Sequence, residues 1–445
     1  MEPLSLFTPR ASLAALGLRL QTWRVWDVIR HQLQIKQKVR KHQPLDKVLD
    51  CFINILAGGA GLNAINLLVR PDVAVQRAFG RQTCAEQSTI SDTLNACTSE
   101  NVQQLRAAVQ SILRQRGQAY QHDYATAWQV LDIDTTGLPA GRLGQGVTKG
   151  YFAGHKSCRG RQLGRVVASA YDEIIVDQLY SGKRQLESSL SQLVEMAENA
   201  LTLGQNQRRR IVLRVDAGGG SETNINWILN RGYWLLIKIH NWQRVMKLST
   251  SVTDWYTDAQ VPGRQVGWVE APYAYAQLTR QVALRKRKPN GKWLHQVVVF
   301  NLTDAMVFDL AHYAMPQAYT PREVLFAALA AYDQRGGGAE TQNKGDKQGL
   351  HLAHRNKHSF VAQEILVLLA QLAHNLIIWT RNDLARADDY FAHYGIRRMV
   401  RDVLQIPGCV QLDATGQVVH ITLQADYPLA AKVHPLLERP TSDEM

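Results

Sequence analysis

The run AWQVLDIDTTGLP, residues 127–139, is where the chain changes from helical to strand-like patterning. Apolar residues fill its first half and Asp134 follows them, an arrangement that holds a carboxylate rigidly at the edge of a sheet. A second run of the same kind, IVLRVDAGGG at residues 211–220, reaches Asp216. The sequence therefore predicts two strands that each present an aspartate at one end.

The order of elements around these two runs predicts the fold class. In chain order they are strand-like runs at 127–134, 162–170 and 174–180, a helix at 186–203, a strand at 211–216, a short helix near 225 and a strand at 233–239. Three strands, helix, strand, helix, strand is the order of a ribonuclease H-like α/β domain. We therefore expect a catalytic domain of that class.

The flanking segments suggest the organisation of the rest of the chain. Residues 1–122 have apolar patterns of helical period and are predicted to form an all-α region. Residues 245–305 alternate in a strand-like way and contain Pro and Gly turns, which predicts a β-rich insertion. The insertion divides the core into 123–244 and 306–385, and residues 386–445 form a C-terminal helix and hairpin region.

Three local signals in the second half are strong. Thr320, Pro321 and Glu323 make a capping box, which predicts a helix start. A long helix is expected at 360–384; its most apolar run is too short to span a bilayer and contains Gln, His and Asn, so we interpret it as a buried helix and expect no membrane association. A hairpin is predicted to turn at 414–416.

Charge and cysteine content indicate the partner class and compartment. Lys plus Arg number 51 and Asp plus Glu 38, a net charge of +13, which favours nucleic acid as partner; the alternative is a merely basic surface. The five cysteines are odd in number and scattered, which argues against a disulfide framework or a zinc knuckle. A reducing cytoplasm fits this pattern best.

The stretch RAFGRQTCAEQSTISDTLNAC, from Arg77, has the outline of a helix-turn-helix. A helix end is followed by a break at Gly80 and a second helix that begins near Glu86. That second helix would lay Ser88 and Thr89 against base edges in a DNA major groove. Two ordinary helices of a bundle with solvated polar residues are the alternative.

The strand-terminal carboxylates suit metal-dependent phosphodiester chemistry. Two hard cations help such a reaction most, one at the attacking oxygen and one at the leaving oxygen, and Mg²⁺ prefers a few carboxylate ligands. Asp134 and Asp216 fit that need, although a strand-terminal aspartate is also a common turn or cap residue. Asp132 competes with Asp134, because alternation places both on the same face of the strand.

The segment YDQRGGGAETQNKGDK, which begins at Tyr332, resembles the Tyr-Arg-Glu-Lys signature of bacterial insertion-sequence DDE transposases. Tyr332 and Arg335 match the first pair, Glu340 and Lys347 match the second, and Lys344 occupies a further basic position that some members use. Four residues separate Arg335 from Glu340, where the signature has three. The extra residue falls in a glycine run that can absorb it as a helix interruption.

The resemblance covers roughly residues 125–385, because DTT at Asp134, VDAGG at Asp216 and the C-terminal helix also look like family motifs. It implies that Asp134, Asp216 and Glu340 are catalytic and bind Mg²⁺, with Mn²⁺ as a possible substitute. The residues that it implies hold DNA phosphates are Tyr332, Arg335, Lys344 and Lys347.

The resemblance also implies an activity: cleavage of transposon ends and their joining to target DNA, by a homodimer in a synaptic complex on double-stranded DNA in the bacterial cytoplasm, at the nucleoid. In the family the insertion touches the cleaved end, so the basic cluster Arg285, Lys286, Arg287 and Lys288 is expected to contact phosphate, or else to be a solvated hairpin tip. The alternatives are a ribonuclease H-like nuclease without strand transfer, and a catalytically inactive or co-opted copy that only binds DNA.

Overall fold

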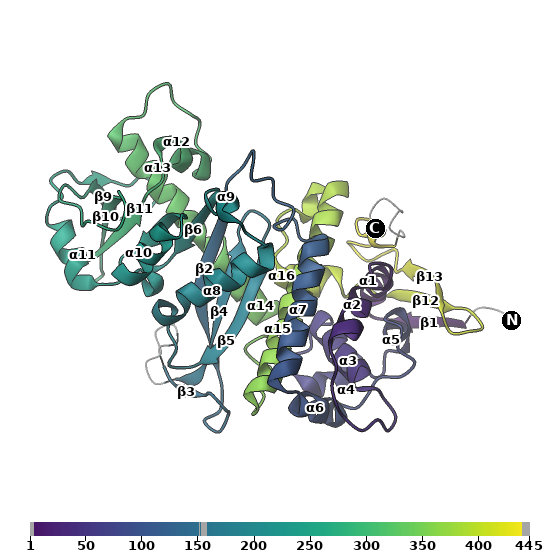
Figure 1. Ribbon diagram of the computed structural model, residues 1–445. Helices are drawn as coiled ribbons and strands as arrows, with labels where there is room; N and C mark the ends of the chain where they lie inside the picture. Colours follow the sequence, from purple (N-terminus) through teal and green to yellow (C-terminus); the bar gives the residue numbers. More distant parts are fainter. Residues whose placement is uncertain (1–3, 151, 153–157, 438–445) are drawn as a thin grey trace.

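The computed structural model describes residues 4–150, 152 and 158–437 of the chain, and its central feature is a ten-stranded mixed sheet (Figure 1). The five strands at its centre are β2 (Gln129–Pro139), β4 (Arg159–Ala168), β5 (Glu173–Ser181), β6 (Ile211–Val215) and β7 (Trp234–Lys238). Strands β2, β6 and β7 are parallel neighbours, whereas β4 pairs antiparallel with β2 and β5 pairs antiparallel with β4. All five were predicted from the sequence, in this chain order.

Helices cover both faces of this central sheet. Gly164 of β4 faces Leu193 of α8 (Leu186–Leu201), whereas the next residue, Arg165, pairs with Asp346 of α14 (Ala339–Gly349). Since successive strand residues point to opposite faces, α8 and α14 lie on opposite sides. Burial on both faces explains why the strand β6 reads as a nearly continuous apolar run.

The segment predicted as a β-rich insertion extends the same sheet. Strand β11 pairs antiparallel with β7, and the sheet continues outward through β10, β9 and β8. Their bounds are β8 Tyr256–Thr257, β9 Arg264–Trp268, β10 Arg280–Arg287 and β11 Trp293–Phe300. The segment starts differently from the prediction, because α11 (Trp242–Ser249), capped by Asn241, is a helix that continues past residue 245.

Two helices cover the outer part of the sheet, and a third helix connects two strands of its central part. The helices are α12 (Asp304–Leu310) and α13 (Pro321–Asp333), and α10 (Glu222–Asn230) connects β6 to β7. The predicted capping box at the start of α13 is confirmed, since Thr320 and Glu323 bond to each other's backbone N–H groups. Helix α13 runs toward the C-terminal end of β6, where Asp216 follows the strand.

The sequence had suggested an all-α N-terminal region, but this region contains one strand in addition to its helices. Its helices are α1 (Ala11–Thr22), α2 (Val25–Gln32), α3 (Pro44–Leu56), α4 (Ile65–Leu68), α5 (Val73–Ala78), α6 (Gln87–Ala96) and α7 (Ser99–Arg116). Strand β1 (Leu4–Thr8) precedes them and pairs with β12 (Gly408–Leu412), which pairs with β13 (Val418–Leu423) in the predicted C-terminal hairpin. The two ends of the chain therefore close one small sheet (Figure 1).

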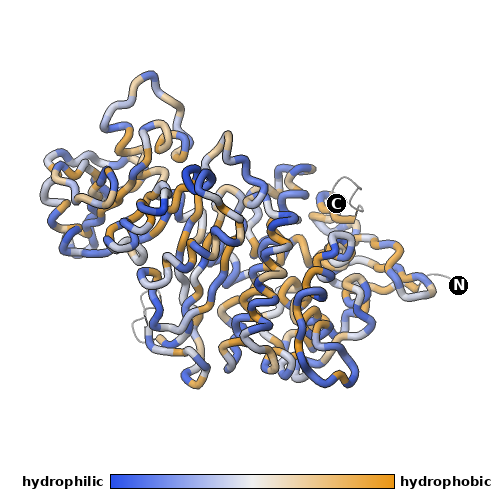
Figure 2. Tube along the Cα trace, in the orientation of Figure 1, coloured by the Kyte–Doolittle hydropathy of each residue, from blue (hydrophilic) through white to orange (hydrophobic). Residues whose placement is uncertain are grey.

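The longest helix, α15 (Phe360–Ala387), lies between the central sheet and the N-terminal helices. Its length and composition would suffice to cross a membrane, but 94% of its most apolar window is buried in the fold, so the predicted buried helix is confirmed. Figure 2 shows apolar residues gathered in this helix and in the interior strands. All five cysteines are free, as their spacing predicted.

Candidate active site

Asp134 and Asp216 lie side by side where the parallel pairing of β2 and β6 ends. Asp216 follows the last residue of β6, but β2 continues past Asp134 to Pro139, so the prediction that Asp134 ends its strand is wrong. In the parallel pair β2 and β6, Ile133 is in register with Val215, so the two aspartates are the next residues on each strand. Neighbouring strands are about 4.8 Å apart, which places the two backbones at that spacing. The two predicted strands are therefore parallel neighbours that bring the two aspartates together.

Asp134 is mostly buried and carries an unusual environment for a carboxylate. Its side chain is 14% exposed; Oδ1 lies 3.0 Å from Arg335 Nη2, and Oδ2 accepts a hydrogen bond from Asn343 at 3.1 Å. Burial raises the pKa of Asp134 to about 6, with Asp216 and Glu340 adding to the rise and Arg335 opposing it. Asp216 and Glu340 therefore both lie near enough to Asp134 to disfavour its ionised form.

Asp132, the competing candidate on the same strand face, is fully engaged in the fold. Its carboxylate accepts a two-point contact from Arg214, at 2.5 and 2.8 Å, and a hydrogen bond from Ser169 Oγ at 2.6 Å. The side chain has no exposed surface. Arg214 also donates to the carbonyl of Ala331 at 2.7 Å, at the end of α13. Asp132 therefore forms a structural ion pair with Arg214, and this pair fixes the segment that leads to Glu340.

Asp216 caps the short turn that follows β6. Its Oδ1 accepts a hydrogen bond from the backbone N–H of Gly218 at 2.8 Å. The glycines that follow serve chain packing, because a Cβ at Gly220 would lie 1.7 Å from the carbonyl oxygen of Lys238 on β7. Glycine at position 220 lets the turn after β6 pack against the end of β7.

Glu340 stands in the first turn of α14, with 58% of its side chain exposed. The chain reaches it through a helix break: α13 ends at Asp333, a 3₁₀ turn covers Gln334–Gly336, and α14 begins at Ala339. This is the predicted interruption that absorbs the extra residue. Gly338 is confined by the neighbouring strand, because a Cβ there would lie 1.7 Å from Asp132 Oδ2.

Arg335 joins two of the three predicted catalytic carboxylates. Besides its contact with Asp134, its Nη1 donates to Glu340 Oε1 at 2.6 Å. Burial lowers the pKa of Arg335, but attraction to Asp134, Asp216 and Glu340 outweighs that effect and raises it. The arginine predicted from the resemblance to hold phosphate lies, in the protein without DNA, among the carboxylates.

Tyr332 is buried beside the second aspartate rather than open to solvent. Its hydroxyl donates to the carbonyl of Val215 at 3.4 Å, and the ammonium of Lys238 lies 4.7 Å from its ring centroid. Only 4% of the residue is exposed. In this arrangement Tyr332 supports the end of β6.

The two predicted lysines of α14 differ in environment. Lys344 is exposed, four residues after Glu340 in the same helix. Lys347 Nζ donates to Thr136 Oγ1 at 2.5 Å, next to the first aspartate motif. Burial and the nearby Arg165 lower the pKa of Lys347, and Asp134 opposes them. The predicted helix is correct, and it brings both lysines to the side of the carboxylates.

Sequence reasoning missed the buried ion network that holds α14 in place. Arg165 makes a two-point contact with Asp177, both distances 2.7 Å, and its Nη1 lies 2.7 Å from Asp346 Oδ2 on α14. Asp346 also pairs with His374 Nδ1 at 2.7 Å. All four side chains have no exposed surface. Only the charged residue Asp346 inside the KGDK motif hinted at this role.

The remaining predicted DNA-binding residues lie outside the carboxylate cluster. Arg285 is held between two indole rings, 4.1 Å from the Trp255 centroid and 4.6 Å from that of Trp293. The other three members of the basic cluster and the two α6 residues are exposed: Lys286, Arg287, Lys288, Ser88 and Thr89. Helix α6 begins after Glu86, as predicted for the second helix of a helix-turn-helix.

The carboxylates fit a divalent cation by donor chemistry, although they are not arranged as ligands around one point. Within the residues that the structure describes, no three His, Cys, Asp or Glu side chains converge closely enough to hold a metal ion. The guanidinium of Arg335 lies between Asp134 and Glu340 and supplies the positive charge there. Oxygen ligands of this type are those that Mg²⁺ prefers.

Comparison with known proteins bears on the whole chain. Residues 21–441 match the protein family described as "Transposase DDE domain group 1". No curated protein sequence matches the chain. Among solved structures, a piggyBac transposase in a cryo-EM synaptic complex with hairpin DNA is similar, at a TM-score of 0.46 and 12% identity, over 91% of this chain and 82% of that chain.

Proposed function

The chain belongs to the family of transposases with a group 1 DDE domain, and from that premise we propose that it cleaves the ends of a transposon and joins them to target DNA. The finer assignment is to the insertion-sequence transposases with the Tyr-Arg-Glu-Lys signature. The observation that carries it is that Asp134 and Glu340 both pair with the Arg335 guanidinium, and that Asp216 lies beside Asp134 at the end of the parallel pairing of β2 and β6. Transposition itself is the function that family membership implies.

The strand order supports a ribonuclease H-like catalytic core. Across the centre the strands run β5, β4, β2, β6 and β7, with the first three antiparallel and the last three parallel. The first aspartate lies on the central strand and the second on its parallel neighbour. Glu340 comes from a helix on the face of this sheet that also carries the buried ion network.

We propose that Mg²⁺, or Mn²⁺ in its place, is held by Asp134, Asp216 and Glu340. Divalent cations there would polarise the scissile phosphate and neutralise charge that develops on its oxygens. Arg335 must then release at least one carboxylate, and its guanidinium becomes free to contact a DNA phosphate with two parallel hydrogen bonds. This reconciles its observed pairing with the phosphate role that the resemblance implies.

The other residues of the site position the reacting groups. Asn343 donates to Asp134, and Lys347 donates to Thr136 two residues further along β2, so α14 and β2 are joined across the site. Lys344 is exposed beside Glu340 and is proposed to contact the DNA backbone. Double-stranded DNA held by two copies of the chain in a synaptic complex, in the bacterial cytoplasm, is the assembly we propose.

The test is a strand-transfer assay with purified protein, Mg²⁺ and the DNA that flanks the coding sequence. Joined products are expected from the wild type, and none from Glu340→Gln, which removes one charge and little volume at an exposed position. The variant should still bind the end DNA. Cleavage without joining would instead support a nuclease, binding alone would support a DNA-binding copy, and wild-type cutting by Glu340→Gln would overturn the site.

A further inference from the structure

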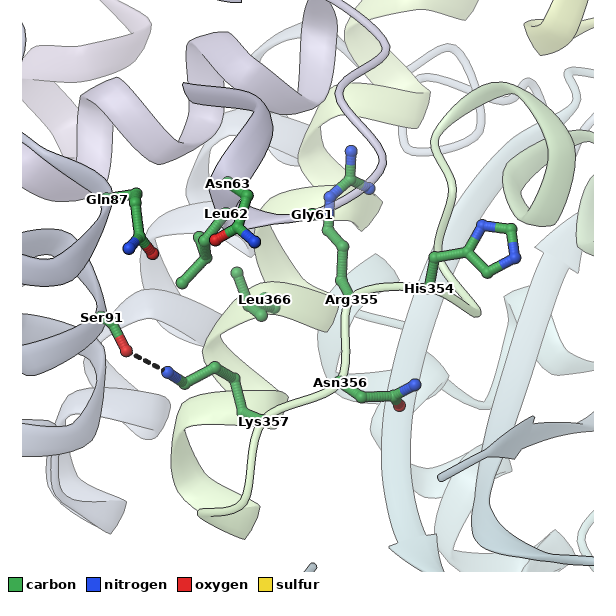
Figure 3. Close-up of a pocket in the computed structure, with 10 residues that line it drawn as sticks. All are labelled: Gly61, Leu62, Asn63, Gln87, Ser91, His354, Arg355, Asn356, Lys357 and Leu366. Carbon is green, nitrogen blue, oxygen red and sulfur yellow. Dashed lines mark hydrogen bonds between the residues drawn. The ribbon is translucent and has the colours of Figure 1, made fainter. Parts of the chain in front are cut away.

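A cavity of about 310 Å³ lies where the N-terminal helices meet the segment that leads into α15 (Figure 3). One wall comes from the turn after α3 and from α6; the other comes from the loop that precedes α15. The lining residues are Gly61, Leu62, Asn63, Gln87, Ser91, His354, Arg355, Asn356, Lys357 and Leu366. Two cations and no carboxylate are among them.

Arg355 is a buried cation whose side chain is incompletely hydrogen-bonded. It is 3% exposed, and its Nη2 donates to the carbonyl of Gly59. Its Nε and Nη1 are buried and have no hydrogen-bond partner. Burial lowers the pKa of Arg355 to about 10, and Cys51 and Asp346 oppose that shift. A buried charge with unsatisfied donors destabilises the fold unless a partner of opposite charge meets it.

Lys357 adds a second positive charge from the same loop. Its Nζ donates to Ser91 Oγ at 2.5 Å, which ties the loop to α6 (Figure 3). Burial lowers the pKa of Lys357, and Asp92, which is exposed next to Ser91, acts against this. Side-chain amides of Gln87 and Asn356 supply further donors around the cavity.

We propose that this cavity binds a phosphate group, and that the group is a backbone phosphate of the DNA that the protein cleaves. The inference rests on the proposed function for the identity of the ligand. The ammonium of Lys357 can meet a phosphodiester oxygen as a point charge, and the buried guanidinium of Arg355 in the cavity wall adds a second positive charge. Ser91 follows Ser88 by one turn of α6, so a phosphate held here would set the register of the helix against the bases.

The test combines a protein variant with a chemically altered DNA. Lys357→Gln removes one charge from the partly exposed residue, and the buried Arg355 is left intact so that the fold is preserved. End-containing duplexes carry one neutral methylphosphonate each, at successive backbone positions. In wild type, one position should weaken binding about ten-fold or more, and that loss should be clearly smaller in Lys357→Gln, which retains only the Arg355 charge.

Salt dependence and a matched control complete the DNA experiment. Lys357→Gln should reduce the slope of log affinity against log salt by about 1. Lys432→Gln makes the same charge change at an ammonium that already pairs with Asp388, and it should retain the position-specific loss. If every methylphosphonate weakens wild type and Lys357→Gln equally and the slopes agree, the DNA assignment is overturned.

Inorganic phosphate distinguishes the source of the ligand. Without DNA, phosphate at constant ionic strength should raise the Tm of wild type more than that of Lys357→Gln. If phosphate shifts the two Tm values differently but the methylphosphonates affect both proteins equally, the ligand is a free phosphate. If wild type and Lys357→Gln behave alike in both experiments, the proposed site is overturned. Strand transfer is scored separately, so methylphosphonate coupling in a protein that does not cleave would support the cavity and refute the proposed activity.

Discussion

Two aspartates on one strand should respond in opposite ways to the same isosteric change. Asp132 is fully buried and holds Arg214 by two contacts at 2.5 and 2.8 Å. Asp132→Asn removes that charge and leaves the Arg214 cation buried, which should lower the free energy of unfolding by about 3–5 kcal/mol. A typical domain has about 5–15 kcal/mol in total, so this is a large share.

Asp134→Asn should cost little stability and abolish cleavage. The pKa of Asp134 rises from 3.8 to about 6 on folding, so above pH 6 the ionised form is disfavoured in the folded state by on the order of 3 kcal/mol. Asparagine removes that penalty, and it also removes the ion pair between Asp134 and Arg335. Arg335 retains its ion pair with Glu340. We expect a change between zero and about 3 kcal/mol of stabilisation, with DNA cleavage reduced on the order of a hundred-fold or more.

Urea unfolding at pH 7.5 measures the first quantity, and end cleavage with Mg²⁺ measures the second. The linear slope of unfolding should agree among wild type and both variants, so that midpoints can be compared. The reasoning is refuted if Asp132→Asn unfolds at the same urea concentration as wild type. It is also refuted if Asp134→Asn loses several kcal/mol of unfolding free energy while it still cuts DNA. Either result would contradict the roles assigned to the two residues.

Three further outcomes are expected. Gly338→Ala places a Cβ 1.7 Å from Asp132 Oδ2 and should destabilise the fold by about 1–3 kcal/mol in urea unfolding, whereas Gly336→Ala, with nothing within 4 Å, should not. Arg335→Ala should bind Mn²⁺ at lower concentration in calorimetry without DNA, because the competing cation is gone, whereas the exposed Arg398→Ala should match wild type. Affinity for end DNA should fall steeply between 50 and 200 mM salt, and a flat response in a binding titration would contradict phosphate contacts.

The approximate positions of the two aspartates could be predicted because both follow apolar runs that form neighbouring parallel strands. The end of β2 could not be predicted, because its antiparallel pairing with β4 carries the strand past Asp134 to Pro139. The choice between Asp132 and Asp134 could not be made, because both side chains point to the same face. It depends on Arg214, which lies 82 residues away in sequence from Asp132.

The features that the sequence did not predict depend on long-range contacts. Strand β1 has an ordinary short apolar pattern, and only its pairing with β12, about four hundred residues later, makes it a strand. Arg335 matched a signature for phosphate contact, but its partners in the folded chain are decided by the break at Gly338 that brings Glu340 back toward β2. The buried network of Arg165 and Asp346 likewise joins β4 to α14.

Strand β2 therefore carries, two positions apart, one aspartate that stabilises the fold and one that we propose to be catalytic. Asp132 points to Arg214, which is buried and fully paired, and this pair holds the end of α13 through Ala331. Asp134 points to Arg335, whose carboxylate partners include the exposed Glu340. If a divalent cation replaces these ion pairs, as we propose, Arg335 would move, whereas the Asp132–Arg214 ion pair, which is inaccessible to solvent, would hold the strand in register.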